Sequence, residues 1–174
     1  MARQRPTVAM KRIVDNLKKN FIQVAKGTAY KETAQFAAEI IVKRTRLGYG
    51  VFKHLGPRGK FMALADRTVE ARKKMKTMGM LSSLTTPKRS NLTATGQMLD
   101  SVDTVKRGDK WYIEPTGTRS DGLTNYEVAE FAHKGSRNRP PRPFMNISGA
   151  EQSQIVRFYR RQFTGLIKKL KMLR

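Results

Sequence analysis

The side chains that could perform catalysis are few in this sequence, and they are poorly grouped. Neither His54 nor His133 has an adjacent carboxylate to orient its imidazole, so a Ser-His-Asp arrangement has no starting point. The closest carboxylate pairs are Asp100 with Asp103 and Glu127 with Glu130. Each pair has the spacing of one helix face, whereas a metal-dependent nuclease needs clustered carboxylates. We therefore expect no enzymatic activity, no cofactor and no metal site.

A second possible chemistry is phosphate binding by the segment 44–60, RTRLGYGVFKHLGPRGK. Its glycines lack the spacing of a GxxxxGK[ST] phosphate loop, and no strand is expected before it. The glycines, the proline and the basic excess predict a loop that is not part of any packed element. Such a loop would act as a basic finger on nucleic-acid phosphates without reading base sequence. The residues expected to face phosphate are Arg44, Arg46, Lys53, Arg58 and Lys60.

The most distinctive stretch is 125–144, NYEVAEFAHKGSRNRPPRPF. It divides at Gly135 into an apolar group with two glutamates and a segment rich in arginine and proline. Proline fixes its own φ near about −65° and biases the preceding residue toward an extended backbone. The second half is therefore expected to be a stiff arm that holds its arginines in a fixed relation to an aromatic anchor, Phe144. The alternative, on residue types alone, is an ordinary loop between two helices.

Helical periodicity accounts for most of the first ninety residues. A first helix is expected from Thr7 to a glycine stop at Gly27, and Thr28 is placed to cap a second helix that runs to about Arg44. The two helices would form an antiparallel pair or a kinked rod, and the sequence does not choose between them. A third helix is expected over 61–78, followed by a connector rich in serine and threonine.

The remaining residues, 91–174, contain signals for both strands and helices. A short helix or turn at 95–101 precedes two strands at 102–106 and 110–114, with a glycine-containing hairpin turn between them. Ser148 and Glu151 then have the spacing of a helix capping box. The apolar residues that follow recur every three or four positions, as on one face of a long helix. They are Ile155, Phe158, Tyr159, Phe163, Leu166, Ile167, Leu170 and Leu173.

The fold class that we predict is α+β. A small antiparallel sheet packs with the long C-terminal helix over residues 91–174, and a basic helical region over residues 1–90 precedes them. The glycine-rich loop 44–60 belongs to that first region. We expect the two regions to form one folded unit, because 174 residues suffice for a single domain with helical appendages.

The charge balance is extreme. Lys and Arg number 36 against 13 Asp and Glu, for a net charge of +23 and a sequence pI of about 10.9. Such a chain calls for a polyanionic neighbour, with nucleic acid the first candidate, an anionic membrane the second and an acidic protein surface the third. The chain has no cysteine, so it has neither disulfides nor thiolate metal ligands. No apolar run approaches the roughly 18 residues of a membrane span, so we expect a soluble protein made in the cytoplasm.

Several short motifs, in a fixed order, resemble a known family. They are LTATGQMLDSV at 92–102, a strand pair, the segment Tyr126–Phe131, Arg142-Pro143-Phe144 and a long terminal helix. Together they resemble the tail-completion (head-tail joining, neck) proteins of tailed bacteriophages, which include minor tail protein Z-like proteins. The resemblance covers roughly residues 90–174. The sequence departs from the family pattern at Pro141, where a small residue is usual, and at Ala132, where glycine is usual.

The resemblance implies a structural virion protein. It would form a homo-oligomeric ring, hexameric or alternatively twelve-fold, that completes the tail or joins it to the portal around the DNA channel. Its partners would be the portal or head-tail adaptor and the tail tube or terminator proteins, with non-specific contact to packaged DNA and no membrane. Head-to-tail contacts between copies close such rings, and truncation of Phe144 would then break assembly but leave the monomer folded. The expected interface residues are Tyr126, Phe131, Arg137, Arg139, Arg142, Pro143 and Phe144.

The sequence also supports a second hypothesis, in which the chain belongs to a different functional class. The charge fits a cellular protein that binds DNA or RNA without sequence preference, of the nucleoid or ribosomal type, equally well. Against this reading, the basic residues are spread along the whole chain, and no helix-turn-helix or aromatic stacking motif is evident.

Overall fold

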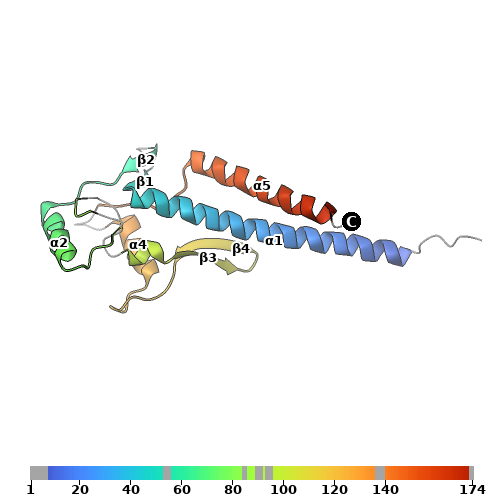
Figure 1. Ribbon diagram of the computed structural model, residues 1–174, viewed down its shortest axis with the longest axis horizontal. Helices are drawn as coiled ribbons and strands as arrows, with labels where there is room; N and C mark the ends of the chain where they lie inside the picture. The colour runs from blue at the N-terminus through green and yellow to red at the C-terminus, as the bar shows by residue number, and fades with distance from the viewer. Residues whose placement is uncertain are drawn as a thin grey trace, which may run out of the picture.

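The computed structural model describes residues 8–172, except 53–55, 84–85, 89–91, 93–95 and 136–139. As predicted, the fold class is α+β: the described residues form five helices and two separate two-stranded antiparallel sheets (Figure 1). The helices are α1 (Val8–Arg46), α2 (Asp66–Thr77), α3 (Gln97–Asp100), α4 (Asn125–Lys134) and α5 (Gly149–Met172). The strands are β1 (Tyr49–Phe52), β2 (Gly56–Lys60), β3 (Val102–Arg107) and β4 (Lys110–Pro115).

One helix of 39 residues, α1, replaces the two helices that we predicted. It runs through Gly27 without a break, so both the antiparallel pair and a stop at this glycine were wrong (Figure 1). Thr28 does not cap a new helix, because its hydroxyl donates back to the carbonyl of Val24 at 3.1 Å, within the same helix. A lone glycine in a helix costs only about 1 kcal/mol, which a long packed helix tolerates.

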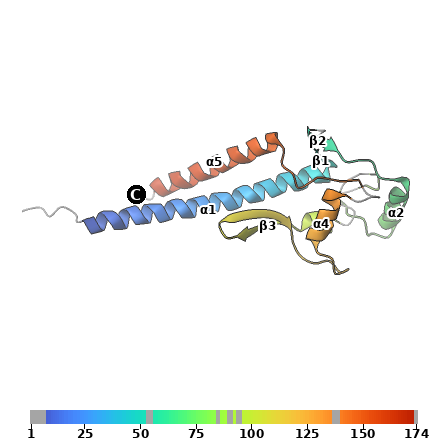
Figure 2. The ribbon, with the colours of Figure 1, turned by 180° about the vertical axis from the view of Figure 1, so that it is seen from behind.

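Helix α5 lies antiparallel to α1 along much of its length (Figures 1 and 2). Stacked aromatic pairs join the two helices, with ring centroids 4.3 Å apart for Phe36–Phe158 and 5.0 Å apart for Tyr30–Tyr159. The predicted capping box at the start of α5 is confirmed, because the Ser148 amide donates to Glu151 Oε2 at 2.8 Å and the Glu151 amide donates back to Ser148 Oγ at 3.3 Å. These contacts position the first turn of α5 beside the end of α1.

The hairpin of β3 and β4 is also confirmed. Arg107 pairs with Lys110 at its closed end, and Gly108 adopts a φ of +60° at the first central position of the two-residue turn. Glycine is favoured there because other residues reach positive φ only with strain. The hairpin packs across α1 on the side of the molecule away from α5 (Figures 1 and 2).

The glycine-rich segment is a packed hairpin, β1–β2, and not the unpacked loop that we predicted. Gly50 is buried, and a Cβ at this position would lie 2.7 Å from the ring of Phe61 and 3.0 Å from the carbonyl oxygen of Pro143. The glycine therefore permits close packing. Phe61 was expected to begin a helix, but its amide donates to the carbonyl of Gly48, so it extends the hairpin, and α2 begins only at Asp66.

The core lies where the end of α1 meets both hairpins, α3, α4 and the segment before α5. Its buried members are Ile41, Phe61, Met98, Leu99, Ala129 and Phe144. The predicted burial of Met98 and Leu99 in a short helix is confirmed. Residues from both sides of the expected boundary near residue 90 share this one core, so packing joins the two regions.

Candidate functional site

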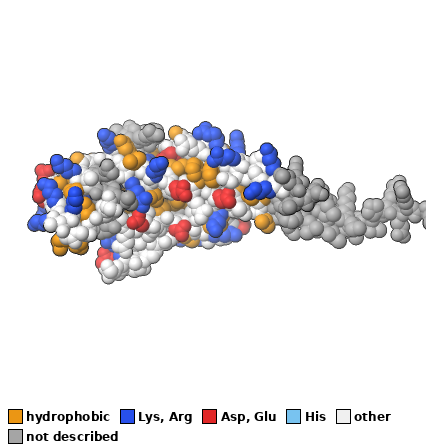
Figure 3. All heavy atoms as spheres, viewed as in Figure 1, with side chains coloured by type: hydrophobic (Ala, Val, Ile, Leu, Met, Phe, Trp, Pro, Cys, Tyr) orange, Lys and Arg blue, Asp and Glu red, His pale blue; other side chains and the backbone are white. Residues whose placement is uncertain are grey.

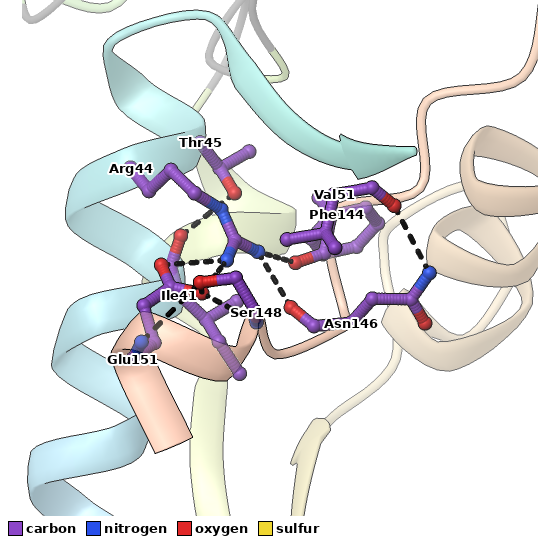
Figure 4. A network of polar contacts seen from close by, with 8 residues as sticks. All are labelled: Ile41, Arg44, Thr45, Val51, Phe144, Asn146, Ser148 and Glu151. Carbon is purple, nitrogen blue, oxygen red and sulfur yellow. Dashed lines mark hydrogen bonds and ion pairs between the residues drawn. The ribbon is translucent and has the colours of Figure 1, made fainter. Parts of the chain in front are cut away.

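The guanidinium of Arg44, near the C-terminal end of α1, is the centre of a network of polar contacts (Figure 4). Its Nη1 donates to both carboxylate oxygens of Glu151, at 2.7 and 2.6 Å. Its Nη2 donates to the carbonyl of Asn146 at 2.8 Å and also to the carbonyl of Phe144. The side chain of Arg44 is 8% exposed and that of Glu151 is 14% exposed, so this is a buried, hydrogen-bonded ion pair.

The Arg44 network joins four parts of the chain. Glu151 lies in the first turn of α5, where a carboxylate suits the helix dipole, and Arg44 lies in the last turn of α1, where a cation does. Asn146 extends the network to β1, because its Nδ2 donates to the carbonyl of Val51 at 3.2 Å (Figure 4). The pair therefore holds the ends of both long helices and the segment between α4 and α5 in one arrangement.

This geometry corrects the role that we assigned to Arg44. A phosphate-facing arginine must reach solvent, whereas this guanidinium is enclosed by Glu151 and two backbone carbonyls. Those carbonyls belong to residues that lie outside any helix or strand, and Arg44 supplies them with a hydrogen-bond donor. Arg44 organises the fold rather than binding DNA.

The other four residues of the expected phosphate-facing set lie in different settings. Lys60, in β2, is exposed and stays available to an anion. Arg46 pairs with Asp100, which reduces its value as a free charge at the surface. The backbone of Arg58 is in β2 but its side chain lies outside the described residues, as does all of Lys53. The structure therefore does not gather the set into one described basic surface.

Phe144 is the centre of the core and not an anchor presented to a neighbour. It is fully buried (0% exposed) and packs against the other core residues, with the ring of His133 6.2 Å away between centroids. The expectation that it docks into a second subunit is therefore wrong. An aromatic side chain already enclosed by its own chain has no free surface to offer a partner.

The Arg-Pro-Phe segment is bound along its length to its own chain. The Arg142 amide donates to the carbonyl of Ala132 in α4 at 2.8 Å, and the carbonyl of Pro143 accepts from the Val51 amide in β1 at 3.0 Å. Both Arg142 and Pro143 are half-buried. Burial, and secondarily the nearby charge of Arg142, lower the pKa of Arg72 in α2. Residues 140–144 therefore form a strap across the core rather than a projecting arm.

Two of the expected interface residues do face solvent. Tyr126 is 54% exposed and Phe131 is 62% exposed, both on α4, so neither is a packing anchor within the chain. The helix is capped by Thr124, whose hydroxyl accepts from the Glu127 amide at 3.1 Å, and it buries Asn125 and Ala129. Arg137 and Arg139 lie outside the described residues. The exposed aromatics of α4 are thus the members of the set that remain open to a partner.

His133 supplies a testable pH dependence. Burial, and secondarily the charge of Lys134, lower the pKa of His133 below its ordinary value of 6.5. The unfolded chain therefore takes up this proton at a higher pH than the folded chain does, and folding stability should fall as the pH drops from 6.5 toward the lower folded value. Urea unfolding at pH 7.5 and 5.5 measures the effect.

The matched control for this pH effect is His133→Gln, which removes the titrating group. The variant should lose less stability between pH 7.5 and 5.5 than the wild type, because every other group titrates alike in both proteins. Equal losses in the two proteins would mean that burial of His133 does not contribute.

The described residues were also compared with the requirements of a metal site and of a membrane span. In the described residues, no group of three or more His, Cys, Asp or Glu side chains is placed to hold a metal ion. Every described helix is also too short or too polar to cross a lipid bilayer. No protein-family model matches this chain, and no curated protein or solved structure matches it either. What the chain does must therefore be argued from its own surfaces.

The pairing of Arg44 with Glu151 was not predicted from the sequence, although the position of each residue in its helix is unusual. Glu151 is the only acidic residue of α5, and Arg44 ends a long apolar face of α1. An isolated carboxylate on a basic helix and an arginine at the end of another helix are plausible partners once the helices are known to meet. Nothing in the sequence states that they meet.

Proposed function

We propose that this chain is a structural subunit of a tailed-phage virion. It would form a ring at the neck, where it completes the tail or joins it to the portal around the DNA channel. The observation that carries the proposal is the ordered series of α3, the β3–β4 hairpin, α4, the Arg-Pro-Phe segment and the long helix α5. This series is the feature in which the chain resembles tail-completion proteins.

Exposed apolar side chains support an assembling role. Tyr126 and Phe131 project from α4, and three methionines elsewhere, Met62, Met78 and Met80, are each more than half exposed. Large exposed apolar and aromatic side chains are typical of residues that contribute binding energy at protein interfaces. Methionine is also adaptable, which suits contacts with more than one kind of neighbour.

The net charge of +23 supports a position beside DNA. A ring of such subunits would surround passing DNA with positive charge and contact its phosphates without reading sequence. The same charge supports the second candidate, a cellular protein that binds DNA or RNA non-specifically. The two proposals differ in what holds copies together, since a ring needs protein contacts that persist without nucleic acid.

The first test is the mass of the purified protein in solution, by light scattering, with and without duplex DNA and at low and high salt. A discrete multimer that persists at high salt without DNA is the expected result, because apolar contacts tolerate salt whereas phosphate contacts do not. A monomer that associates only on DNA, and separates as salt rises, would favour the cellular nucleic-acid binder.

The α4 aromatics give a sharper prediction. Replacing Tyr126 and Phe131 together by Ala should weaken multimer formation by at least about tenfold, since truncation of an interface hot spot costs about 2 kcal/mol or more. The thermal midpoint of the monomer should hardly change, because both side chains are exposed. Tyr112→Ala, at an exposed tyrosine of β4, is the matched control and should assemble normally. Unaltered assembly of the double variant would remove α4 from the interface.

A further inference from the structure

A groove runs along α1 on the side bordered by β3 and α3. Its volume is about 830 Å³, and its floor is apolar, with Val42, Leu47 and Val102 among its lining residues. Leu47 is 58% exposed, which is high for a leucine in a folded protein. An elongated apolar groove of this kind suits an amphipathic helix, which lays one face into it.

The rim of this groove carries carboxylates in a strongly basic protein. Glu39, Asp100 and Asp103 line it, together with two cations, Lys43 and Arg46. Asp100 pairs with Arg46, but no cation of the described residues pairs with Glu39 or Asp103. Two carboxylates, Glu39 and Asp103, are therefore open to the cations of a partner that is both apolar and basic.

The outer face of α5 has the complementary composition. Val156 is 42% exposed there and has two cations close to it in the helix, Arg157 and Arg160. The exposed cations of this face are Arg157, Arg160, Arg161, Lys168 and Lys169. Figure 3 shows Lys and Arg side chains along the edge that α5 forms. Each copy of the protein thus carries both an apolar groove with two carboxylates unpaired among the described residues and a helix with a basic outer face.

The two surfaces lie on opposite sides of the molecule. Helix α1 meets α5 through Tyr30 and Phe36, whereas it lines the groove with Gln35, Glu39 and Val42, which helical spacing places on its other side. The outer face of α5 points farther away still (Figures 1 and 2). Two different patches on opposite sides make a head-to-tail contact that repeats from copy to copy, which is the contact type that closes rings.

We propose that the basic outer face of α5 of one copy docks into the groove between α1 and β3 of a second copy. This inference rests on the proposed ring and names its subunit contact. Cations of α5 then neutralise Glu39 and Asp103, and Val156 covers part of the apolar floor. The contact also lowers the repulsion that a charge of +23 creates between copies.

Charge reversal on each side tests the contact. The groove variant is Glu39→Lys with Asp103→Lys, and the helix variant is Arg157→Glu with Arg160→Glu. Each variant alone should associate at least about 100-fold more weakly than the wild type, because like charges placed opposite one another cost several kcal/mol. An equimolar mixture should recover the multimer, since each variant face then meets a face of opposite charge. Sedimentation velocity measures the masses, and circular dichroism verifies that each variant is folded.

The control variant is Asp66→Lys with Glu70→Lys on α2, which changes the net charge by the same amount as the groove variant at exposed positions. It should assemble as the wild type does. A multimer that survives in the groove and helix variants would overturn this contact and leave the ring proposal standing. A wild type that stays monomeric at all concentrations and salt conditions would overturn both.

Discussion

Phe144→Ala is expected to lower the free energy of unfolding by about 3 to 5 kcal/mol, the range observed when a buried phenylalanine is truncated in a packed core. Phe144 is 0% exposed and belongs to a core cluster with residues of α1, α3 and α4 and with Phe61, which follows β2. Its loss would leave a cavity between four elements, which can collapse only if all of them shift. Urea unfolding followed by circular dichroism measures the change.

Phe131→Ala is the matched control for Phe144→Ala. It removes the same side chain from a position that is 62% exposed, so the free energy of unfolding should change by no more than about 0.5 kcal/mol. The comparison separates folding from assembly, because Phe144 should act on the monomer and Phe131 on contacts between copies. A Phe144→Ala protein as stable as the wild type would contradict the burial of this ring.

Arg44→Met is expected to cost about 3 to 5 kcal/mol, because breaking one side of a buried ion pair leaves an uncompensated charge. Glu151 would keep its hydrogen bonds from Ser148 but lose both hydrogen bonds from Nη1 of the guanidinium. The carbonyls of Phe144 and Asn146 would lose a donor as well. Methionine conserves much of the side-chain volume, so the measured loss reports the polar network more than the packing.

The double variant Arg44→Met with Glu151→Gln tests the physical cause. Removing both charges should be less damaging than removing Arg44 alone, since no uncompensated carboxylate remains. Arg46→Ala is the surface comparison: its ion pair with Asp100 is solvent-exposed, and such pairs contribute about 0 to 1 kcal/mol. If Arg44→Met and Arg46→Ala cost the same, the Arg44 network would have no special role in stability.

The burial of Phe144 and Arg44 changes how assembly is to be tested. The strap at 140–144 stabilises the monomer, so a loss of assembly after a change in it would not distinguish misfolding from a lost contact. Surface residues are better probes. Tyr126 and Phe131 on α4, and the charges of the groove and of α5, can be altered without removing a core contact.

Several elements could be predicted from the sequence because their signals are local. The β3–β4 hairpin needs only two strand-forming runs and a glycine that reaches positive φ at position 108. The start of α5 needs only Ser148 and Glu151, whose mutual hydrogen bonds involve residues three apart. The helical spacing of its apolar residues likewise predicts a face for α1 to cover. Such local signals also predict the α+β class, the short helix α3 and the order of these elements along the chain.

The tertiary structure decided the roles that depend on distant partners. From the sequence, Arg44 was predicted to be a surface cation, but in the structure it pairs with Glu151, which is 107 residues away in sequence. Gly50 looks like part of a loop until Phe61 and Pro143 close on it, and Phe144 looks like a free anchor until the core surrounds it. The sequence determined the β3–β4 hairpin, α3 and the start of α5, but not the continuity of α1 or the β1–β2 hairpin. Whether a given arginine, glycine or phenylalanine lies inside or outside was decided only by packing, because burial depends on contacts that local spacing does not encode.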